Sequence, residues 1–210
     1  YVRGKSKSEL GDYKGAILDY NKAIEINPNY IAPYFFRGLL KAKLEDHRGA
    51  VVDFSKTLEL DGIFASAKVY FNRGKSKAAL KDFRGAIMDF RKVIELDPNF
   101  MMAYYEKGIT KFELEDYRGS ILDLSKAIEL NPKFKWNYIN RGTAKLKLEN
   151  YKEAIADYNI AIELDKNFMD AYFKRGITNF FLKEKNEACL DWSRAGELGS
   201  RDAYRLIKEY

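Results

Sequence analysis

The sequence contains few of the residues that build chemical sites. Cys189 is its only cysteine and His47 its only histidine. This excludes a disulfide framework and a cysteine-based metal site, and it removes most histidine-dependent chemistry. No nucleophile, base and acid recur together in a pattern that suggests catalysis. We therefore expect neither an enzyme nor a cofactor.

Long apolar runs are also missing, and none approaches the ~20 residues that a membrane-spanning helix requires. The chain begins with Tyr1 instead of methionine, so we expect a fragment with further repeats upstream. A signal peptide or lipid anchor would then have been lost. The sequence favours a cytoplasmic location without establishing it.

The composition that is present favours helices. Hydrophobic residues make up 46% of the 210 residues and charged residues 32%, with four prolines, which is typical of a helix-rich protein. The formal net charge of +6 is modest for this length. It is weak evidence for a nucleic-acid partner.

The stretch RGKSK occurs twice, at 3–7 and 73–77, and looks like the end of a phosphate-binding loop. Such a loop reads G-x-x-x-x-G-K-[ST], and its first glycine turns the chain so that backbone N–H groups surround the phosphates. Five residues before Gly74 stands Val69, in a run without a turn-forming residue. We interpret the stretch as part of a structural repeat and not as a nucleotide site.

A glycine recurs at intervals of 34, 36, 34, 34 and 34 residues. The six positions are Gly4, Gly38, Gly74, Gly108, Gly142 and Gly176. A tyrosine precedes five of these glycines by four residues, a small residue follows each by twelve, and a bulky apolar residue follows each by sixteen. A period of this length indicates a stack of supersecondary units.

The spacing predicts two helices in each unit. Tyr34, Gly38 and Lys41 lie at i, i+4 and i+7, on one face of a helix, and Ala50 and Phe54 begin the same pattern in a second. Asn-Pro or Asp-Pro then ends the second helix in several units, because proline cannot continue the hydrogen-bond ladder. We expect the glycine and the small-residue column opposite it to let the two helices approach closely.

A 34-residue helix–turn–helix with an aromatic residue before glycine, then Ala-x3-aromatic, then proline, resembles the tetratricopeptide repeat. The resemblance implies an all-α, right-handed α-solenoid of about six units with a C-terminal capping helix. We expect a single superhelical domain over 1–210. Its units are predicted at about 1–30, 31–66, 67–100, 101–134, 135–168 and 169–200, with a cap at 201–210. The Arg-Gly pair, where the family commonly has leucine before glycine, is similar to a variety frequent in bacterial repeat proteins and favours a bacterial source.

Charged columns on the packing faces predict ion pairs within each unit. A lysine or arginine directly precedes each repeat glycine, and an aspartate lies three residues after each small residue. Because a buried charge is costly unless it is paired, we expect a ladder of pairs such as Arg37–Asp53 and Arg141–Asp157. Lysines three residues after the glycine are expected to join it. The charged columns nearly cancel, which argues against a basic patch directed at a polyanion.

In the tetratricopeptide family the first helices line a concave groove that usually binds an extended peptide or a helix of a partner. The resemblance therefore implies a non-catalytic scaffold or adaptor that binds a protein or peptide segment in this groove. The groove candidates are side chains of the first helices away from the Tyr/Gly stripe. They are Phe35, Phe36, Leu39, Lys68, Asn72, Lys75, Tyr105, Ile109, Phe112, Trp136, Asn140, Thr143, Phe173, Lys174, Ile177 and Phe181.

Several alternatives stay open at this point. About half of the groove candidates would pack between neighbouring repeats instead of facing a partner. The alternative function is RNA binding through residual basic surface, and copies of the chain would associate through exposed ends. A two-residue insertion near 61–67 is either a harmless loop or a functional kink. Ala203, Leu206 and Ile207 share one helical face and predict the capping helix.

Overall fold

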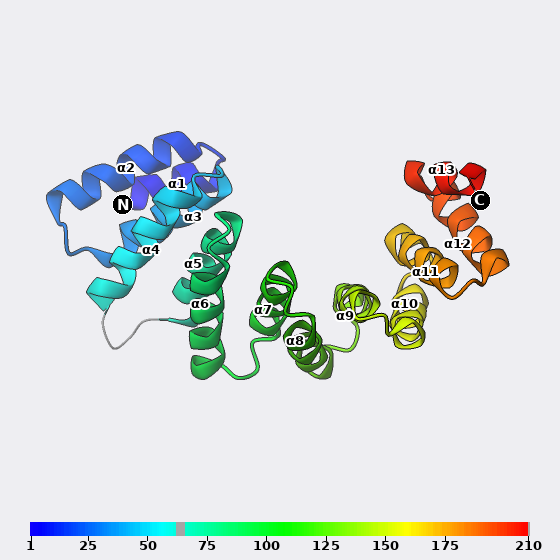
Figure 1. The fold of residues 1–210 in the computed structure, drawn as a ribbon. Helices are drawn as coiled ribbons and strands as arrows, with labels where there is room; N and C mark the ends of the chain where they lie inside the picture. The colour runs from blue at the N-terminus through cyan, green and yellow to red at the C-terminus, as the bar shows by residue number, and fades with distance from the viewer. Residues whose placement is uncertain (62–65, 210) are drawn as a thin grey trace. The chain divides into compact units, whose positions relative to one another are not determined.

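The computed structural model describes residues 1–61 and 66–209, and it contains thirteen helices and no strand in these ranges (Figure 1). The helices come in pairs. The pairs are α1 (Val2–Glu9) with α2 (Tyr13–Ile26), α3 (Ile31–Lys43) with α4 (His47–Asp61), α5 (Ala67–Ala79) with α6 (Phe83–Leu96), α7 (Met101–Glu113) with α8 (Tyr117–Leu130), α9 (Lys135–Lys147) with α10 (Tyr151–Leu164), and α11 (Met169–Phe181) with α12 (Lys185–Glu197), followed by α13 (Arg201–Glu209). The prediction of an all-α solenoid of helix–turn–helix units is confirmed.

Each pair is closed by a short turn with one left-handed residue. Glu115 and Glu149 occupy this position with φ of 61° and 60°, whereas Gly11 fills it in the first pair with φ of 84°. An aspartate then caps the second helix in the early units; Asp116, for example, accepts a hydrogen bond from the Gly119 N–H at 2.9 Å. The left-handed residue reverses the chain, and the cap satisfies a free N–H group at the start of the next helix.

The repeat glycines make room for aromatic rings. A Cβ atom on Gly142 would lie 2.7 Å from Cε1 of Tyr158, and one on Gly176 would lie 2.6 Å from Cδ1 of Trp192. The small-residue column also lies near the glycine, as expected: the Ser120 and Ala188 carbonyl oxygens would be 3.4 and 3.2 Å from a Cβ on Gly108 and Gly176. The bulky residue four positions later lies closer still, so glycine leaves room for it against the first helix.

These rings form the core of five of the six repeats, and in the fourth repeat the fully buried Leu124 takes the place of the ring. Tyr20, Phe54, Phe90 and Tyr158 are at most 1% exposed, and Trp192 is 2% exposed. Tyrosines four residues before the repeat glycine also hydrogen-bond to the loop that precedes their helix. The hydroxyl of Tyr34 donates to the Pro28 carbonyl at 3.1 Å, and that of Tyr138 to the Pro132 carbonyl at 3.0 Å.

The chain divides into two compact units, Tyr1–Glu106 and Lys107–Tyr210, with the division inside α7. The single continuous domain expected from the sequence stays a prediction. In the second unit α13 packs on α12, and its Ala203, Leu206 and Ile207 join a cluster around Trp192. The predicted capping helix is therefore confirmed.

The two-residue insertion near 61–67 falls mostly on residues 62–65, outside the described residues. Cys189 in α12 is half-buried.

Candidate partner-binding surfaces

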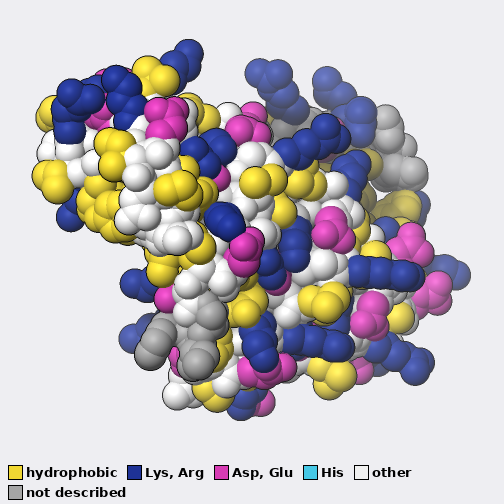
Figure 2. Space-filling model, turned by 90° about the vertical axis from the view of Figure 1, so that its left-hand side faces the viewer, with side chains coloured by type: hydrophobic (Ala, Val, Ile, Leu, Met, Phe, Trp, Pro, Cys, Tyr) yellow, Lys and Arg dark blue, Asp and Glu magenta, His cyan; other side chains and the backbone are white. Residues whose placement is uncertain are grey.

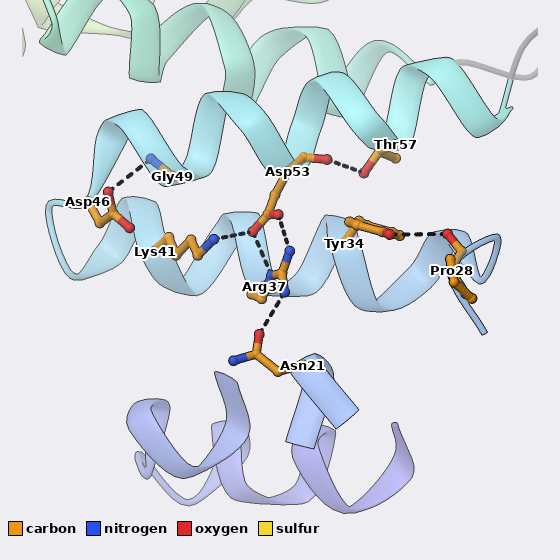
Figure 3. Close-up of polar contacts among 9 residues, drawn as sticks. All are labelled: Asn21, Pro28, Tyr34, Arg37, Lys41, Asp46, Gly49, Asp53 and Thr57. Atoms are coloured by element: carbon orange, nitrogen blue, oxygen red, sulfur yellow. Dashed lines mark hydrogen bonds and ion pairs between the residues drawn. The ribbon is translucent and has the colours of Figure 1, made fainter. Parts of the chain in front are cut away.

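The predicted ladder of ion pairs runs through all six repeats. In the second repeat, Arg37 Nε donates to Asp53 Oδ2 at 2.9 Å and Nη2 to Oδ1 at 2.5 Å, while Lys41 Nζ lies 2.9 Å from Oδ2 (Figure 3). The corresponding pairs in the other repeats are Arg3–Asp19, Arg73–Asp89, Lys107–Asp123, Arg141–Asp157 and Arg175–Asp191. Each aspartate is nearly buried and neutralised within its own repeat, which a buried charge requires.

The arginines also connect successive repeats, which the sequence did not reveal. Figure 3 shows Arg37 Nη1 pointing away from Asp53 toward Asn21 of the preceding repeat, where it donates to Oδ1 at 2.6 Å. Arg73, Arg141 and Arg175 donate in the same way to Ser55, Ser125 and Asn159 at 3.1, 3.0 and 2.5 Å. The planar guanidinium makes this possible, because its N–H groups point in different directions.

One pocket joins groove candidates from three successive first helices of the second unit. Its volume is ≈ 160 Å³, and α7 contributes Ile109 and Phe112, α9 contributes Asn140 and Thr143, and α11 contributes Lys174. The structure thus brings together five residues that the sequence placed on one groove.

Two further side chains line this pocket and were not predicted. Glu113 ends α7 and is exposed, and Ser120 is buried in α8. Glu113 lies four residues after the groove candidate Ile109, on the same face of α7, so the helical pattern had the information to include it. Ser120 belongs to the small-residue column, which carries no signal for a groove.

The charge on Lys174 is set by its surroundings. Burial lowers the pKa of its ammonium group, Asp170 opposes this effect, and Lys147 adds to it. A half-buried lysine that lacks a fully compensating anion is a suitable partner for a carboxylate. Lys174 and Glu113 give the pocket one charge of each sign.

The first unit has two pockets beside its own groove candidates. A pocket of ≈ 540 Å³ is lined by Phe35, Phe36 and Lys68, and one of ≈ 350 Å³ by Leu39, Asn72 and Lys75. His47 and Lys43 also line the smaller one. His47 is half-buried and forms part of the pocket wall.

The remaining candidates have mixed surroundings, and none of them is fully buried. Phe173 and Ile177 pack on the cluster around Trp192. Trp136 lies edge-on against Phe168 with centroids 4.8 Å apart and is 39% exposed. Phe181 stacks on Tyr151 at 5.8 Å and is 55% exposed, and Tyr105 is half-buried in α7.

On the face shown in Figure 2, lysine and arginine side chains lie among acidic and hydrophobic ones. Among the described residues, no three His, Cys, Asp or Glu side chains are grouped so that they would hold a metal ion. None of the described helices has the length and apolar character needed to cross a bilayer.

Models of the TPR repeat match residues 4–45 and 142–181, and models of the tetratricopeptide repeat match 67–100 and 103–134. The matches cover well over half of the chain. The chain belongs to the tetratricopeptide repeat family. No curated protein sequence matches it.

Solved tetratricopeptide structures share the fold of this repeat protein. MamA from Desulfovibrio magneticus has a TM-score of 0.76 at 20% identity, over 80% of this chain and 94% of MamA. YrrB, described as a TPR protein with an unusual peptide-binding site, has a TM-score of 0.74 at 21% identity, over 91% and 98%. The C-terminal part of a TPR repeat-containing protein from Cytophaga hutchinsonii has a TM-score of 0.82 at 17% identity, over 93% and 78%.

Proposed function

We propose that this tetratricopeptide repeat protein is a non-catalytic scaffold that binds an extended segment of a partner protein along its first helices. The observation that carries the proposal is the pocket shared by α7, α9 and α11 in the second unit. One segment lying across three successive helices contacts three repeats at once, so the periodic stack suits an extended ligand.

The lining of this pocket supports a peptide ligand. Ile109 and Phe112 supply apolar surface, and Asn140 and Thr143 supply polar groups. Peptide and small-molecule sites combine mainly apolar walls with a few placed polar groups. Because burial disfavours the charge on Lys174, we expect the bound segment to place a carboxylate beside it.

Family membership supports a protein-interaction role. YrrB, whose structure was described as having an unusual peptide-binding site, has the same fold at 21% identity. By analogy we extend peptide binding to this chain, with the groove residues above as the contact surface.

RNA binding through residual basic surface is the alternative. The ion-pair ladder argues against RNA binding, because its lysines and arginines are already paired with buried aspartates and are not free to bind phosphate. Phosphate binding by the remaining cations would make the affinity fall steeply with salt.

The test is a matched pair of variants used in nuclease-treated pull-downs from cells of the source organism. Ile109→Lys puts a long charged side chain into the groove, and the equivalent position of the third repeat already carries Lys75. Leu122→Lys makes the same change in α8, where Leu122 is 71% exposed and lies outside the pocket. We expect Ile109→Lys to lose a bound protein that Leu122→Lys retains, with equal helical circular dichroism.

Photo-crosslinking from Asn140 would then identify the segment that is bound. Retention of the same proteins by both variants would refute partner binding in the groove. A signal that needs intact nucleic acid and disappears with salt would favour the RNA alternative instead.

A further inference from the structure

The ion-pair cluster of the sixth repeat differs from those of the other five repeats. In the first five repeats a lysine ammonium lies 2.7–3.2 Å from Oδ2 of the ladder aspartate. These lysines are Lys7, Lys41, Lys77, Lys111 and Lys145. In the sixth repeat the position is held by Asn179, whose Nδ2 donates to Asp191 Oδ2 at 3.1 Å. The sixth repeat therefore keeps the aspartate and lacks the ammonium group.

A pocket opens where the lysine is missing. It has a volume of ≈ 560 Å³, and both Asn179 and Asp191 line it. Asp191 is 5% exposed and Asn179 6%. The pocket shares no lining residue with the groove pocket of the same unit, so it is a separate site.

The acceptors for an ammonium group are already in place. Lys111 and Lys145 reach the ladder aspartate and also lie 3.5 and 3.4 Å from the backbone carbonyls of Gly119 and Glu153. The equivalent carbonyl in the sixth repeat belongs to Glu187, which lines the pocket.

Asp191 still has room for a further donor. Its carboxylate accepts Arg175 Nε at 2.9 Å, Arg175 Nη2 at 2.6 Å and the Asn179 amide. A carboxylate has about four acceptor sites, two on each oxygen. Both sites of Oδ2 are taken, by Arg175 Nε and the Asn179 amide, so the site that is left is on Oδ1, and an ammonium group at Oδ2 has to replace the neutral Asn179 amide.

The charge and the walls of the pocket favour the same ligand. The carboxylates of Glu184, Glu187 and Asp191 line it together with two cations, Arg175 and Lys152. Asp191 already neutralises Arg175, so an excess of negative charge is left. Ile155 and Leu182 provide apolar wall for an alkyl chain.

We propose that this pocket binds a primary alkylammonium group from outside the chain, which replaces the Asn179 amide at Asp191 Oδ2 and so takes the place that the ladder lysine fills in the other five repeats. The group has two sources, the lysine side chain of a partner protein or a free alkylamine. Both present the same methylene chain and the same charge.

The test compares the natural chain with Asn179→Lys and Asn99→Lys. Asn179→Lys restores the lysine that the first five repeats have at this position, so the chain's own ammonium group occupies the site. Asn99→Lys adds the same charge at an exposed loop position where the next repeat has Lys133. It controls for net charge.

The probes are n-butylammonium, its neutral analogue n-butanol, and acetyl-Gly-Gly-Lys-Gly-Gly-amide with a norleucine counterpart. Binding is followed by NMR through the side-chain amide signal of Asn179, and in all variants by the thermal midpoint. We expect the amine and the lysine peptide to bind the natural chain and Asn99→Lys, and to bind Asn179→Lys at least about tenfold more weakly. Asn179→Lys should have a higher thermal midpoint without ligand, which separates lost binding from misfolding.

The two sources are distinguished by affinity. Tighter binding of the lysine peptide than of n-butylammonium indicates a partner protein, and the reverse order indicates a free amine. Equal binding of the norleucine peptide, unchanged binding by Asn179→Lys, or no binding of either amine would overturn the proposal.

Discussion

The guanidinium group of Arg141 meets the carboxylate of Asp157 through two parallel hydrogen bonds, Nε to Oδ2 at 2.9 Å and Nη2 to Oδ1 at 2.6 Å. A third N–H group donates to Ser125 Oγ of the preceding repeat at 3.0 Å. One side chain thus joins the two helices of its own repeat and holds the repeat before it.

This relationship predicts unequal costs for two substitutions. Asp157→Ala leaves Arg141 and Lys145 without their anion and should lower the free energy of unfolding by about 3–5 kcal/mol. Arg141→Lys keeps the charge but loses the paired hydrogen bonds to Asp157 and the hydrogen bond to Ser125. We expect it to lower the free energy of unfolding by about 1–3 kcal/mol. Urea unfolding measures both. The exposed pair Lys92–Glu95 is the control, and Glu95→Ala should cost no more than ~1 kcal/mol; an equal cost for Glu95→Ala and Asp157→Ala would contradict the prediction.

Gly142→Ala should destabilise the fifth repeat although alanine favours helices. Its Cβ would lie 2.7 Å from the Tyr158 ring, which is fully buried. Overpacking of this kind costs about 1–3 kcal/mol, more than the ~1 kcal/mol that alanine contributes in a helix. Thermal unfolding of Gly142→Ala, Tyr158→Ala and the double variant checks it. The penalty for Gly142→Ala should disappear once the ring is removed, and an unchanged penalty would count against ring contact as its cause.

Asn137→Ala should stabilise the protein. Asn137 is fully buried in α9, and neither its Oδ1 nor its Nδ2 has a hydrogen-bond partner among the described residues. Ala103 and Ala171 fill the same position in the neighbouring repeats and are fully buried. Because an unsatisfied buried amide costs about 1–3 kcal/mol, its removal should raise the free energy of unfolding by about 1 kcal/mol. A clear loss of stability in urea unfolding would mean that the amide is hydrogen-bonded in solution.

Glu149→Gly should also stabilise the protein. Glu149 has a φ of 60°, and the first repeat already uses Gly11 at this position. The left-handed conformation costs a residue with a side chain about 1–2 kcal/mol, and glycine returns about 0.5–1 kcal/mol of this as chain entropy. We expect a net gain of about 0.5–1 kcal/mol in thermal unfolding. Ala156→Gly, in the interior of α10, is the matched control and should lower stability by ~1 kcal/mol.

The ion pair between Arg3 and Asp19 in the first repeat predicts that stability depends on pH. Hydrogen bonds from Arg3, assisted by Lys7, lower the pKa of Asp19 from its ordinary value of 3.8 to about 2. Because the folded-state pKa is the lower one, the stabilisation is present above about pH 4 and is lost as the pH falls toward about 2. The difference in stability between the natural chain and Asp19→Asn, measured by urea unfolding, should be constant above this range and shrink within it. A difference that stays constant down to pH 2 would exclude Asp19 as its source.

Much of the fold could be predicted because its signals are local and repeated. The 3.6-residue period and the proline stops defined the helices, and six copies removed the ambiguity that one copy leaves. The ladder could be predicted because Arg37 and Asp53 both lie on packing faces, where an unpaired charge is costly.

The groove was only partly predictable. The helical pattern placed Ile109, Asn140 and Lys174 on the exposed side of the first helices, and the structure brings them to one pocket. The same pattern also included Phe173, which packs on the cluster around Trp192. A helical period gives the direction of a side chain from its own helix and carries no information on which neighbour covers it.

By itself, then, the sequence determined the repeat, its helix pairs, the capping helix and the partners within each ladder rung, because periodicity and charge neutralisation act within one unit. Only the tertiary structure decided that Gly142 faces the Tyr158 ring, that Arg141 reaches Ser125, and that Asn179 leaves a pocket beside Asp191. These features depend on the distance and orientation between packed helices. That geometry is set by the sum of many contacts, and no single column of the sequence encodes it.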